Sequence, residues 1–288
     1  MATVLITGTS KGIGLITAVT LARAGHTVYA TMRNPARAPE LAQQAAQESL
    51  PIHVSVMDVD SDLSVANAIA AIYQAAGNLD VLVNNAGVER NGSIEELSMD
   101  DFRAVMETNY FGAIRCAKAV IPAMRQCRRG LIVNVTSVAG RVSTSPLGPY
   151  AASKFALEAL SEALAQEMKA FNVRVAIVEP CIIDTPMAHE IELPIPASIY
   201  PQQRRMAHYF AAILRNPTSP LVVAEKIQSI IESGTWQLRH PVGPGAEPLL
   251  ASRMATSDED YIALQSSDDD TWYSIMEQKT GMAIRPRN

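Results

Sequence analysis

The sequence predicts an α/β protein: a doubly wound parallel sheet in a single domain, with an inserted loop and a C-terminal extension. Three observations lead to this prediction. Short runs rich in β-branched residues alternate with longer segments whose apolar residues recur every three or four positions. The short runs are almost continuously apolar, which is typical of parallel strands buried on both faces. Polar or glycine-rich residues follow directly after each of these runs.

Six strands are expected in the first part of the chain, at residues 3–7, 26–31, 52–57, 79–83, 131–136 and 173–179. Helical spacing is clearest between the fourth and the fifth of these, where the apolar residues are Phe102, Val105, Met106, Ala113, Ala117, Val120, Ile121 and Met124. A last helix over 221–233 and a strand over 235–240 complete the sheet. Residues 1–240 are therefore expected to form the main domain.

Residues 186–220 interrupt the alternation and are predicted to form an inserted substrate lid with a short helix around 198–215. The segment holds six prolines: Pro186, Pro194, Pro196, Pro201, Pro217 and Pro220. Its apolar side chains either line a pocket for a bulky apolar molecule or pack the insert onto the core, and both interpretations remain open. They are Met187, Ile191, Leu193, Ile195, Ile199, Tyr200, Met206, Tyr209 and Phe210.

Residues 241–288 form a C-terminal extension that is expected to pack on the core. Two helices are predicted to begin within the segments 256–264 and 266–276, because each opens with acidic residues, which stabilise the positive N-terminal end of a helix.

Composition limits the classes of function. The chain has 288 residues, 48% of them apolar, and a formal net charge of −5 without a basic tract, which argues against nucleic acid as the main partner. Its three cysteines have no metal-type spacing, so we expect no metal site. No apolar run reaches the ~18 residues of a membrane span, and residues 1–6 already resemble a strand, so we expect no signal peptide and a cytoplasmic location.

The segment TGTSKGIG, residues 7–14, allows two interpretations. It fits the G-x-S-x-G elbow that presents a serine nucleophile, which would need an acid and a histidine at the same sheet edge. His26 and His53 lie at strand starts, the wrong edge. A glycine-rich turn that opens a helix instead binds a pyrophosphate through backbone N–H groups. We therefore expect a dinucleotide cradle that consists of Gly8, Ser10, Lys11, Gly12, Ile13 and Gly14.

The end of the second strand indicates which dinucleotide binds. NAD-selective proteins usually carry a carboxylate about 20 residues beyond the glycines to bind the ribose 2′-hydroxyl. No Asp or Glu occurs between Gly14 and Glu40, and Thr31 stands at the expected position. Lys11 and Arg33 add positive charge that suits a 2′-phosphate. NADP(H) is therefore the predicted cofactor, and NAD(H) is less favoured.

Tyr150 and Lys154 are four residues apart at the start of a predicted helix and so share one face. An ammonium at ~4 Å would stabilise a phenolate by about 4 kcal/mol and move the tyrosine pKa from ~10 toward ~7. Ser137, at the end of the preceding strand, is placed to hold the same substrate oxygen. Asn109, a poor residue for a helix interior, is predicted to bind a water beside Lys154. Taken alone, a Y-x-x-x-K pair also fits an exposed i,i+4 contact.

Together with NNAG at 84–87, these motifs resemble, in order and spacing, the short-chain dehydrogenase/reductase superfamily over residues 2 to about 240. The resemblance implies a Rossmann-type fold, a nicotinamide cofactor and an Asn–Ser–Tyr–Lys tetrad at Asn109, Ser137, Tyr150 and Lys154. It also implies that Asp58 and Val59 contact the adenine and that Asn85, Ala86 and Gly87 flank the cofactor. Tyr150 and Lys154 are expected at the nicotinamide ribose, and Ile183 and Thr185 at the carboxamide. The tail is loosely similar to the branch with 17β-hydroxysteroid and retinol dehydrogenases.

The expected function is hydride transfer between NADP(H) and a ketone, an aldehyde or a secondary alcohol, with a bulky apolar substrate. The alternative is a catalytically silent NADP-binding sensor or scaffold with the same fold. A small-residue face at Ala152, Ala156, Ala159 and Ala163 predicts a homodimer or homotetramer. Cys181 stands where the family commonly has glycine, and it either narrows the pocket or points into the core as a small apolar group.

Overall fold

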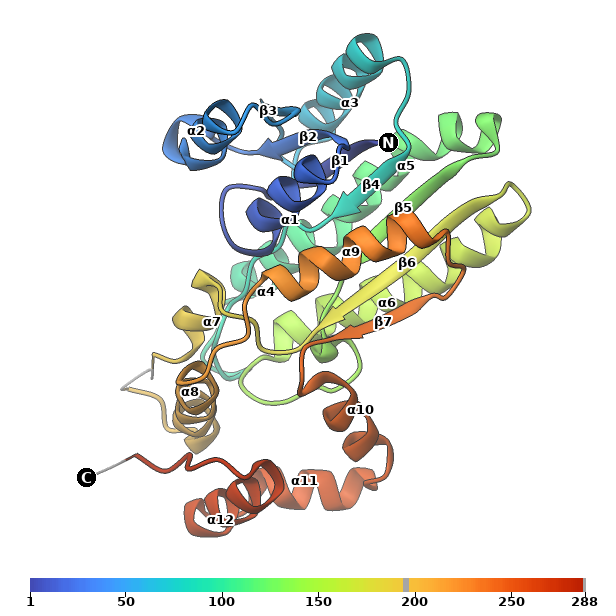
Figure 1. Ribbon diagram of the computed structural model, residues 1–288. Coiled ribbons are helices and arrows are strands. Elements are labelled where there is room, and N and C mark those ends of the chain that lie inside the picture. Colours follow the sequence, from blue (N-terminus) through green and yellow to red (C-terminus); the bar gives the residue numbers. More distant parts are fainter. Residues whose placement is uncertain (194–196, 287–288) are drawn as a thin grey trace.

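The computed structural model of the protein describes residues 1–193 and 197–286. Its centre is a seven-stranded sheet in the order β3-β2-β1-β4-β5-β6-β7, and every neighbouring pair is parallel (Figure 1). The strands are β1 Thr3–Thr7, β2 Thr27–Met32, β3 Ile52–Val56, β4 Val81–Asn84, β5 Gly130–Val135, β6 Val173–Pro180 and β7 Arg239–Val242. The chain winds outward from β1 to β3 and then returns to β4, so the prediction of a doubly wound sheet is confirmed.

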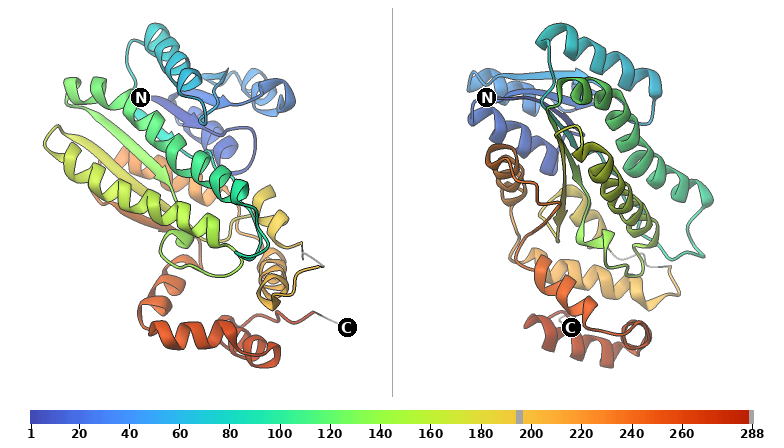
Figure 2. Two further views of the ribbon diagram at one scale, coloured as in Figure 1. Left: turned by 180° about the vertical axis from the view of Figure 1, so that it is seen from behind. Right: turned by 90° about the vertical axis from the view of Figure 1, so that its right-hand side faces the viewer.

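Helices cover both faces of this sheet. They are α1 Gly12–Arg23, α2 Glu40–Gln47, α3 Asp62–Ala76, α4 Met99–Met106, α5 Gly112–Cys127, α6 Gly148–Lys169, α7 Pro186–Ile191, α8 Pro201–Leu214, α9 Leu221–Ser233, α10 Ala246–Met254, α11 Asp258–Ser266 and α12 Asp269–Thr280. Helices α1 and α9 pack on one face, and α3, α5 and α6 pack on the other (Figure 2).

The two layers explain why the strands are apolar throughout. Successive side chains of a strand point to opposite faces of the sheet. In β1, Val4 and Ile6 belong to the core with α1 and α9, whereas Leu5 belongs to the core with α3 and α5. All three side chains are fully buried. A strand between two helical layers therefore needs apolar residues at every position, as observed.

The last strand differs from its prediction. The structure places β7 at Arg239–Val242 rather than 235–240, and pairing with β6 begins at Arg239 opposite Ile177. Thr235 and Gln237 are instead joined by a local hydrogen bond from the Gln237 N–H to Thr235 Oγ1, 3.1 Å. Such local bonds compete with a sheet ladder. Pro241 is tolerated because β7 is an edge strand, where a missing N–H breaks no ladder bond.

Outside residues 194–196, the insert contains two helices rather than the single one predicted. The helix expected around 198–215 is confirmed as α8, but α7 was not anticipated. It begins because Thr185 Oγ1 accepts a hydrogen bond from the Ala188 N–H at 3.4 Å and Pro186 occupies the first helical turn. The predicted insert residues Pro194, Ile195 and Pro196 lie outside the described residues.

The C-terminal extension contacts the insert. Helices α11 and α12 begin after Ser257 and Asp268, within the two acidic segments where helix starts were predicted, and these two side chains cap them. Helix α10 was not anticipated. Trp272 and Tyr273 of α12 are buried against Ala212 of α8. In the chain as described, no helix is both long and apolar enough to cross a membrane. The insert and α10–α12 lie beyond the carboxyl ends of the strands, where they enclose one edge of the sheet (Figure 1).

Candidate active site

A cavity of about 1110 Å³ lies at the carboxyl edge of the sheet, between the strand ends, the insert and the C-terminal extension. In open α/β sheets this edge is the usual ligand site. Sixteen of the predicted site residues line it: Gly8, Ser10, Lys11, Gly12, Ile13, Arg33, Asp58, Val59, Asn85, Ala86, Gly87, Ser137, Tyr150, Lys154, Ile183 and Thr185. Gly14 and Asn109 lie behind this wall.

The glycine turn is packed so closely that side chains cannot replace Gly8 and Gly14. Gly8 has a φ of +70°, and a Cβ there would lie 2.7 Å from the Ala86 Cα. A Cβ on Gly14 would lie 2.3 Å from the Gly8 carbonyl oxygen. The turn leads into α1, whose N-terminal end favours an anion. A turn of this shape, with backbone N–H groups at the start of a helix, suits the phosphates of a dinucleotide.

Polar groups at the ends of β1 and β4 hold the turn in this shape. Thr7 Oγ1 accepts hydrogen bonds from the N–H groups of Asn85 and Ala86, at 3.0 and 2.9 Å. The Asn85 amide in turn donates to the carbonyl oxygens of Thr7 and Gly8, at 2.9 and 3.0 Å. The Asn85 side chain thus stabilises the cradle.

Thr31, at the end of β2, does not occupy the position in the site that the sequence suggested for it. The Thr31 side chain is fully buried and donates to the Ile6 carbonyl oxygen at 3.0 Å, so it does not face the cavity. Met32 and Arg33 line the cavity in its place. Lys11 is exposed and its Nζ lies 3.7 Å from a Glu190 carboxylate oxygen of α7. Two cations thus stand at this end of the site, and the Lys11–Glu190 pair is of the exposed kind that contributes little stability.

Tyr150 and Lys154 lie in the first turns of α6 and both line the cavity. The Lys154 Nζ is 5.6 Å from the centroid of the Tyr150 ring and donates to the Val135 carbonyl oxygen at 2.9 Å. Burial lowers the pKa of Lys154 to about 8, and the Glu158 carboxylate opposes that shift.

The expectation that Lys154 lowers the pKa of Tyr150 toward 7 is wrong for this arrangement. Burial raises the pKa of Tyr150 to about 12, the Ser137 hydroxyl acts to lower it, and the Glu89 charge acts to raise it. The lysine is directed at a backbone carbonyl rather than at the phenol, and desolvation disfavours the phenolate. The phenol is therefore held in its neutral, proton-carrying form.

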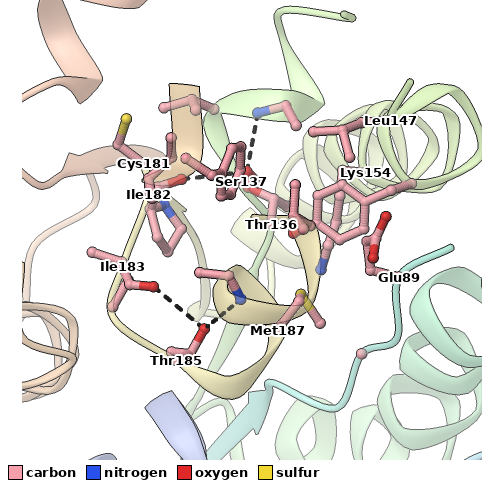
Figure 3. A pocket seen from close by; sticks show the side chains of 18 of the residues that line it. Glu89, Thr136, Ser137, Leu147, Lys154, Cys181, Ile182, Ile183, Thr185 and Met187 are labelled. Atoms are coloured by element: carbon pink, nitrogen blue, oxygen red, sulfur yellow. Dashed lines mark hydrogen bonds between the residues drawn. The ribbon is translucent and has the colours of Figure 1, made fainter. Parts of the chain in front are cut away.

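Ser137 stands at the end of β5, as predicted. Its hydroxyl accepts a hydrogen bond from the Ala139 N–H at 3.0 Å and donates to the Pro180 carbonyl oxygen at 3.3 Å, and Figure 3 shows both bonds. These contacts tie the serine to the last residue of β6 and fix its position in the cavity wall.

Asn109 occupies a short π-helical segment, Glu107–Phe111, between α4 and α5. Its Oδ1 accepts from the Val88 N–H at 2.8 Å, and its Nδ2 donates to the Val88 carbonyl and to Ser153 Oγ, each at 2.9 Å. Both ends of the amide are engaged, so these contacts favour a positioning role over the predicted water-binding one. The side chain fixes the loop after β4 against α6.

Sequence reasoning missed one buried acid and one wall of the cavity. Glu89, two residues after the NNAG motif, is 8% exposed, lines the cavity and lies on the same side as Lys154 (Figure 3). A lone glutamate in a loop carries no signal of burial. The missed wall comes from the C-terminal extension and includes Leu249, Tyr261, Leu264, Trp272 and Met276.

The insert supplies an apolar wall, but only part of the predicted set belongs to it. Met187, Ile191, Met206, Tyr209 and Phe210 line the cavity. Leu193 and Ile199 are instead 63% and 80% exposed, Tyr200 does not face the cavity, and Ile195 is among the residues not described.

The structure combines the two interpretations of Cys181. The side chain packs against the buried cluster that contains Val138 and Val142, and it also lines the cavity. Burial raises the pKa of its thiol, so the thiolate needed for nucleophilic chemistry is disfavoured. Cys181 therefore acts as a small apolar wall residue.

Comparisons with known proteins agree with this site. The family model described as short chain dehydrogenase matches residues 2–195. A 3-ketodihydrosphingosine reductase of Bacteroides thetaiotaomicron is 34% identical over 255 residues, 86% of this chain and 90% of the relative. Human retinol dehydrogenase 8 is 36% identical over 270 residues, 88% of this chain and 86% of the relative. A crystal structure of a short-chain dehydrogenase from Streptomyces avermitilis superposes with a TM-score of 0.77 and 27% identity, covering 96% and 98% of the two chains.

The matched region contains the glycine turn, the NNAG motif, Ser137, Tyr150 and Lys154, which the fold brings to one sheet edge. The chain therefore belongs to the short chain dehydrogenases, a family of oxidoreductases.

Proposed function

We propose that the protein is an NADP(H)-dependent oxidoreductase that transfers a hydride between the nicotinamide and a ketone, an aldehyde or a secondary alcohol, with a bulky, mostly apolar substrate. The observation that supports this most is a single cavity that holds the glycine turn, the Ser137–Tyr150–Lys154 group and an apolar wall. The cavity therefore combines a site for the cofactor, a proton donor and a wall that suits an apolar ligand.

The cofactor would be held along the strand ends. The glycine turn suits the pyrophosphate, Asp58 and Val59 suit the adenine, and Ile183 and Thr185 stand on the opposite side of the cavity from Lys154 (Figure 3). When bound, the nicotinamide supplies or accepts the hydride. At the end of β2, Met32 and Arg33 line the cavity and no carboxylate follows the strand, and the cations Arg33 and Lys11, the latter also paired with Glu190, favour the 2′-phosphate of NADP(H).

Tyr150 is the proposed proton donor for carbonyl reduction. Because its phenol is neutral at physiological pH, its pKa being raised to about 12, it can donate a hydrogen bond and then a proton to the carbonyl oxygen. The Ser137 hydroxyl, which donates its one proton to the Pro180 carbonyl oxygen in the structure, would turn to donate it to the substrate oxygen instead. Lys154 and Asn109 position the surrounding backbone at Val135 and Val88. In the oxidative direction the deprotonated Tyr150 would accept the proton of the alcohol.

The apolar wall supports a bulky substrate. It combines residues of α7 and α8 with residues of the C-terminal extension, so a ligand would be enclosed from two segments distant in sequence. Two relatives carry names that refer to ketodihydrosphingosine and to retinol, which are largely apolar molecules. A water-excluding site of this kind suits hydride transfer.

The test is consumption of NADPH by the purified protein with a panel of apolar ketones and aldehydes, each compared with NADH. We expect turnover with NADPH. Binding of NADPH without turnover of any carbonyl compound would instead support the sensor or scaffold alternative.

We also propose a homodimer or homotetramer through α6. Ala152, Ala159 and Ala163 are exposed on this helix, and Phe155 beside them is 43% exposed. Small residues allow close approach of a second helix, and exposed aromatic rings are common at interfaces. Light scattering at micromolar concentration should show a mass at least twice that of the chain, and a monomer alone would contradict this proposal.

A further inference from the structure

The Glu89 carboxyl group is buried in the cavity wall and has no hydrogen-bond or ion-pair partner among the described residues. The side chain is 8% exposed, and its Oε1 is inaccessible and makes no hydrogen bond. Within residues 1–193 and 197–286, no lysine, arginine or histidine nitrogen lies within 4.0 Å of the carboxylate. Burying such a group without a hydrogen bond is unfavourable. Nothing in the described part of the chain compensates for this.

The backbone around Glu89 holds the carboxyl group toward the cavity. The preceding residue, Val88, is bound at both its N–H and its carbonyl by Asn109. The following residue, Arg90, donates to the Glu89 carbonyl at 2.8 Å and places its Nε 3.3 Å from Asp101, outside the cavity. The Arg90 guanidinium therefore pairs with Asp101 and not with Glu89. The hydrogen bonds on both sides of Glu89 fix the position of its backbone.

Glu89 and Tyr150 line the same cavity, and the Glu89 charge acts to raise the pKa of the phenol. Burial, with the charge of Glu190, also raises the pKa of Glu89 itself to about 7, against a smaller opposing effect of Arg90. The acid can therefore be charged or neutral near physiological pH, and both forms accept hydrogen bonds.

A second buried carboxylate, on the same side of the sheet edge, shows what a structural role requires. Glu158 of α6 is 4% exposed, accepts from Thr136 Oγ1 at 2.6 Å and from Arg239 Nε at 2.9 Å. Its oxygens are satisfied by the protein. Glu89 has similar burial and none of these bonds, so its partner is to be sought in the cavity.

We propose that Glu89 recognises the substrate by accepting a hydrogen bond from an amine or a hydroxyl on the carbon next to the reacting carbonyl. This inference rests on the proposed function, because it takes Tyr150 as the residue that binds the reacting oxygen. The apolar wall then binds the remainder of the molecule. The substrate class is a long-chain ketone with a polar donor beside its carbonyl group.

Three ketones of equal chain length test the proposal: 2-dodecanone, 1-hydroxy-2-dodecanone and 1-amino-2-dodecanone. Binding to the full-length protein is measured by titration calorimetry with NADP+ present, so that the carbonyl group of the ketones cannot be reduced, and absorbance at 340 nm checks that no NADPH forms. The variants are Glu89→Leu, which removes the acceptor, and Glu89→Gln, which keeps a neutral acceptor of the same shape. Glu225→Gln, the same chemical change at an exposed position of α9, is the control.

We expect the wild type and the control to bind at least one donor-bearing ketone about tenfold or more tighter than 2-dodecanone. Glu89→Leu should abolish that preference and change the affinity for 2-dodecanone by less than about threefold. Glu89→Gln separates the two donors, since a preference for the hydroxyl should survive and a preference for the charged amine should be lost.

Equal affinity of the wild type for all three ketones would overturn the proposal. So would a preference that survives Glu89→Leu, or an equal loss for all three ketones, which would indicate a role in the fold. Circular dichroism and the thermal midpoint identify an unfolded variant, and Glu89→Gln remains decisive for the amine if the leucine variant does not fold. Selective binding without any consumption of NADPH would support recognition by Glu89 and contradict the proposed oxidoreductase function. Turnover without selectivity among the three ketones would support the oxidoreductase function and contradict recognition by Glu89.

Discussion

The two walls of the cavity are built in different ways. The nucleotide wall, formed by residues 8, 10–13, 32–33, 58–59 and 85–87, consists mainly of strand ends and turns. The substrate wall, formed by apolar residues of α7, α8 and the C-terminal extension, consists of side chains from helices. The first depends on close approach of backbone to backbone, as at Gly8 and Ala86. The second depends on side-chain packing between segments distant in sequence, as at Ala212 and Trp272.

This difference teaches where each wall tolerates change. A backbone wall has no room for one added methyl group, whereas a side-chain wall can change its shape when a residue is exchanged. Substitutions of Gly8 in the nucleotide wall, or of Gly14 behind it, should therefore weaken cofactor binding strongly, and substitutions in the substrate wall should alter selectivity. Tyr150, Lys154 and Glu89 stand between the two walls, where the chemistry is proposed to occur.

The largest effect is expected where the walls meet. Tyr150→Phe removes the proposed proton donor and leaves the ring, so turnover should fall by about 1,000-fold. The affinity for NADPH should stay within a few-fold, because the glycine turn and Lys154 are unchanged. Steady-state rates and a fluorescence titration with NADPH check both parts. Turnover above a tenth of the wild-type value would contradict the role given to the phenol.

The nucleotide wall is tested by Gly8→Ala, whose Cβ would lie 2.7 Å from the Ala86 Cα. The turn must shift to accommodate it, and we expect the NADPH affinity to fall about 100-fold. Gly25→Ala is the matched control, because Gly25 also has a positive φ, +86°, but a Cβ there would meet no atom within 4 Å. It should reduce stability by about 1–2 kcal/mol and leave the NADPH affinity unchanged. Equal loss of affinity in both variants would mean that backbone strain, not the close approach, is decisive.

Cofactor selectivity should show a smaller effect. Arg33→Ala removes a proposed contact to the 2′-phosphate and should weaken NADPH about tenfold or more, while the NADH affinity stays nearly unchanged. Arg37→Ala, an exposed cation outside the cavity, serves as the control for net charge. Binding titrations of both nucleotides decide the question, and a parallel loss of both would assign Arg33 to the fold.

The smallest effect is expected in the substrate wall. Met187 is half-buried and lines the cavity, so Met187→Ala should raise KM for bulky ketones about tenfold and KM for small ketones less than about twofold. Ile199→Ala, in the same insert but 80% exposed, should change neither. Kinetics with ketones of increasing size provide the measurement. A uniform change across the series would show that this wall does not contact the substrate.

Much of the fold and the nucleotide wall could be predicted from local sequence. Continuous apolar strands, the glycine turn and the tyrosine–lysine pair carry short-range signals, since each depends on residues within a few positions of one another. Because the strands are parallel, their carboxyl ends then lie at the same edge of the sheet, and no additional sequence signal is needed to place them there. Helix α7 and the true limits of β7 were missed because a capping threonine and side-chain bonds within a loop decided them.

The sequence by itself determined that a doubly wound sheet carries a dinucleotide cradle and a tyrosine beside a lysine. Only the tertiary structure decided what surrounds them. The pKa of Tyr150 moved opposite to the prediction because burial outweighed the lysine, whose ammonium binds the Val135 carbonyl. The burial of Glu89 and the place of the C-terminal extension in the cavity wall have the same physical reason. Both depend on how many atoms surround a group, and those atoms come from distant parts of the chain.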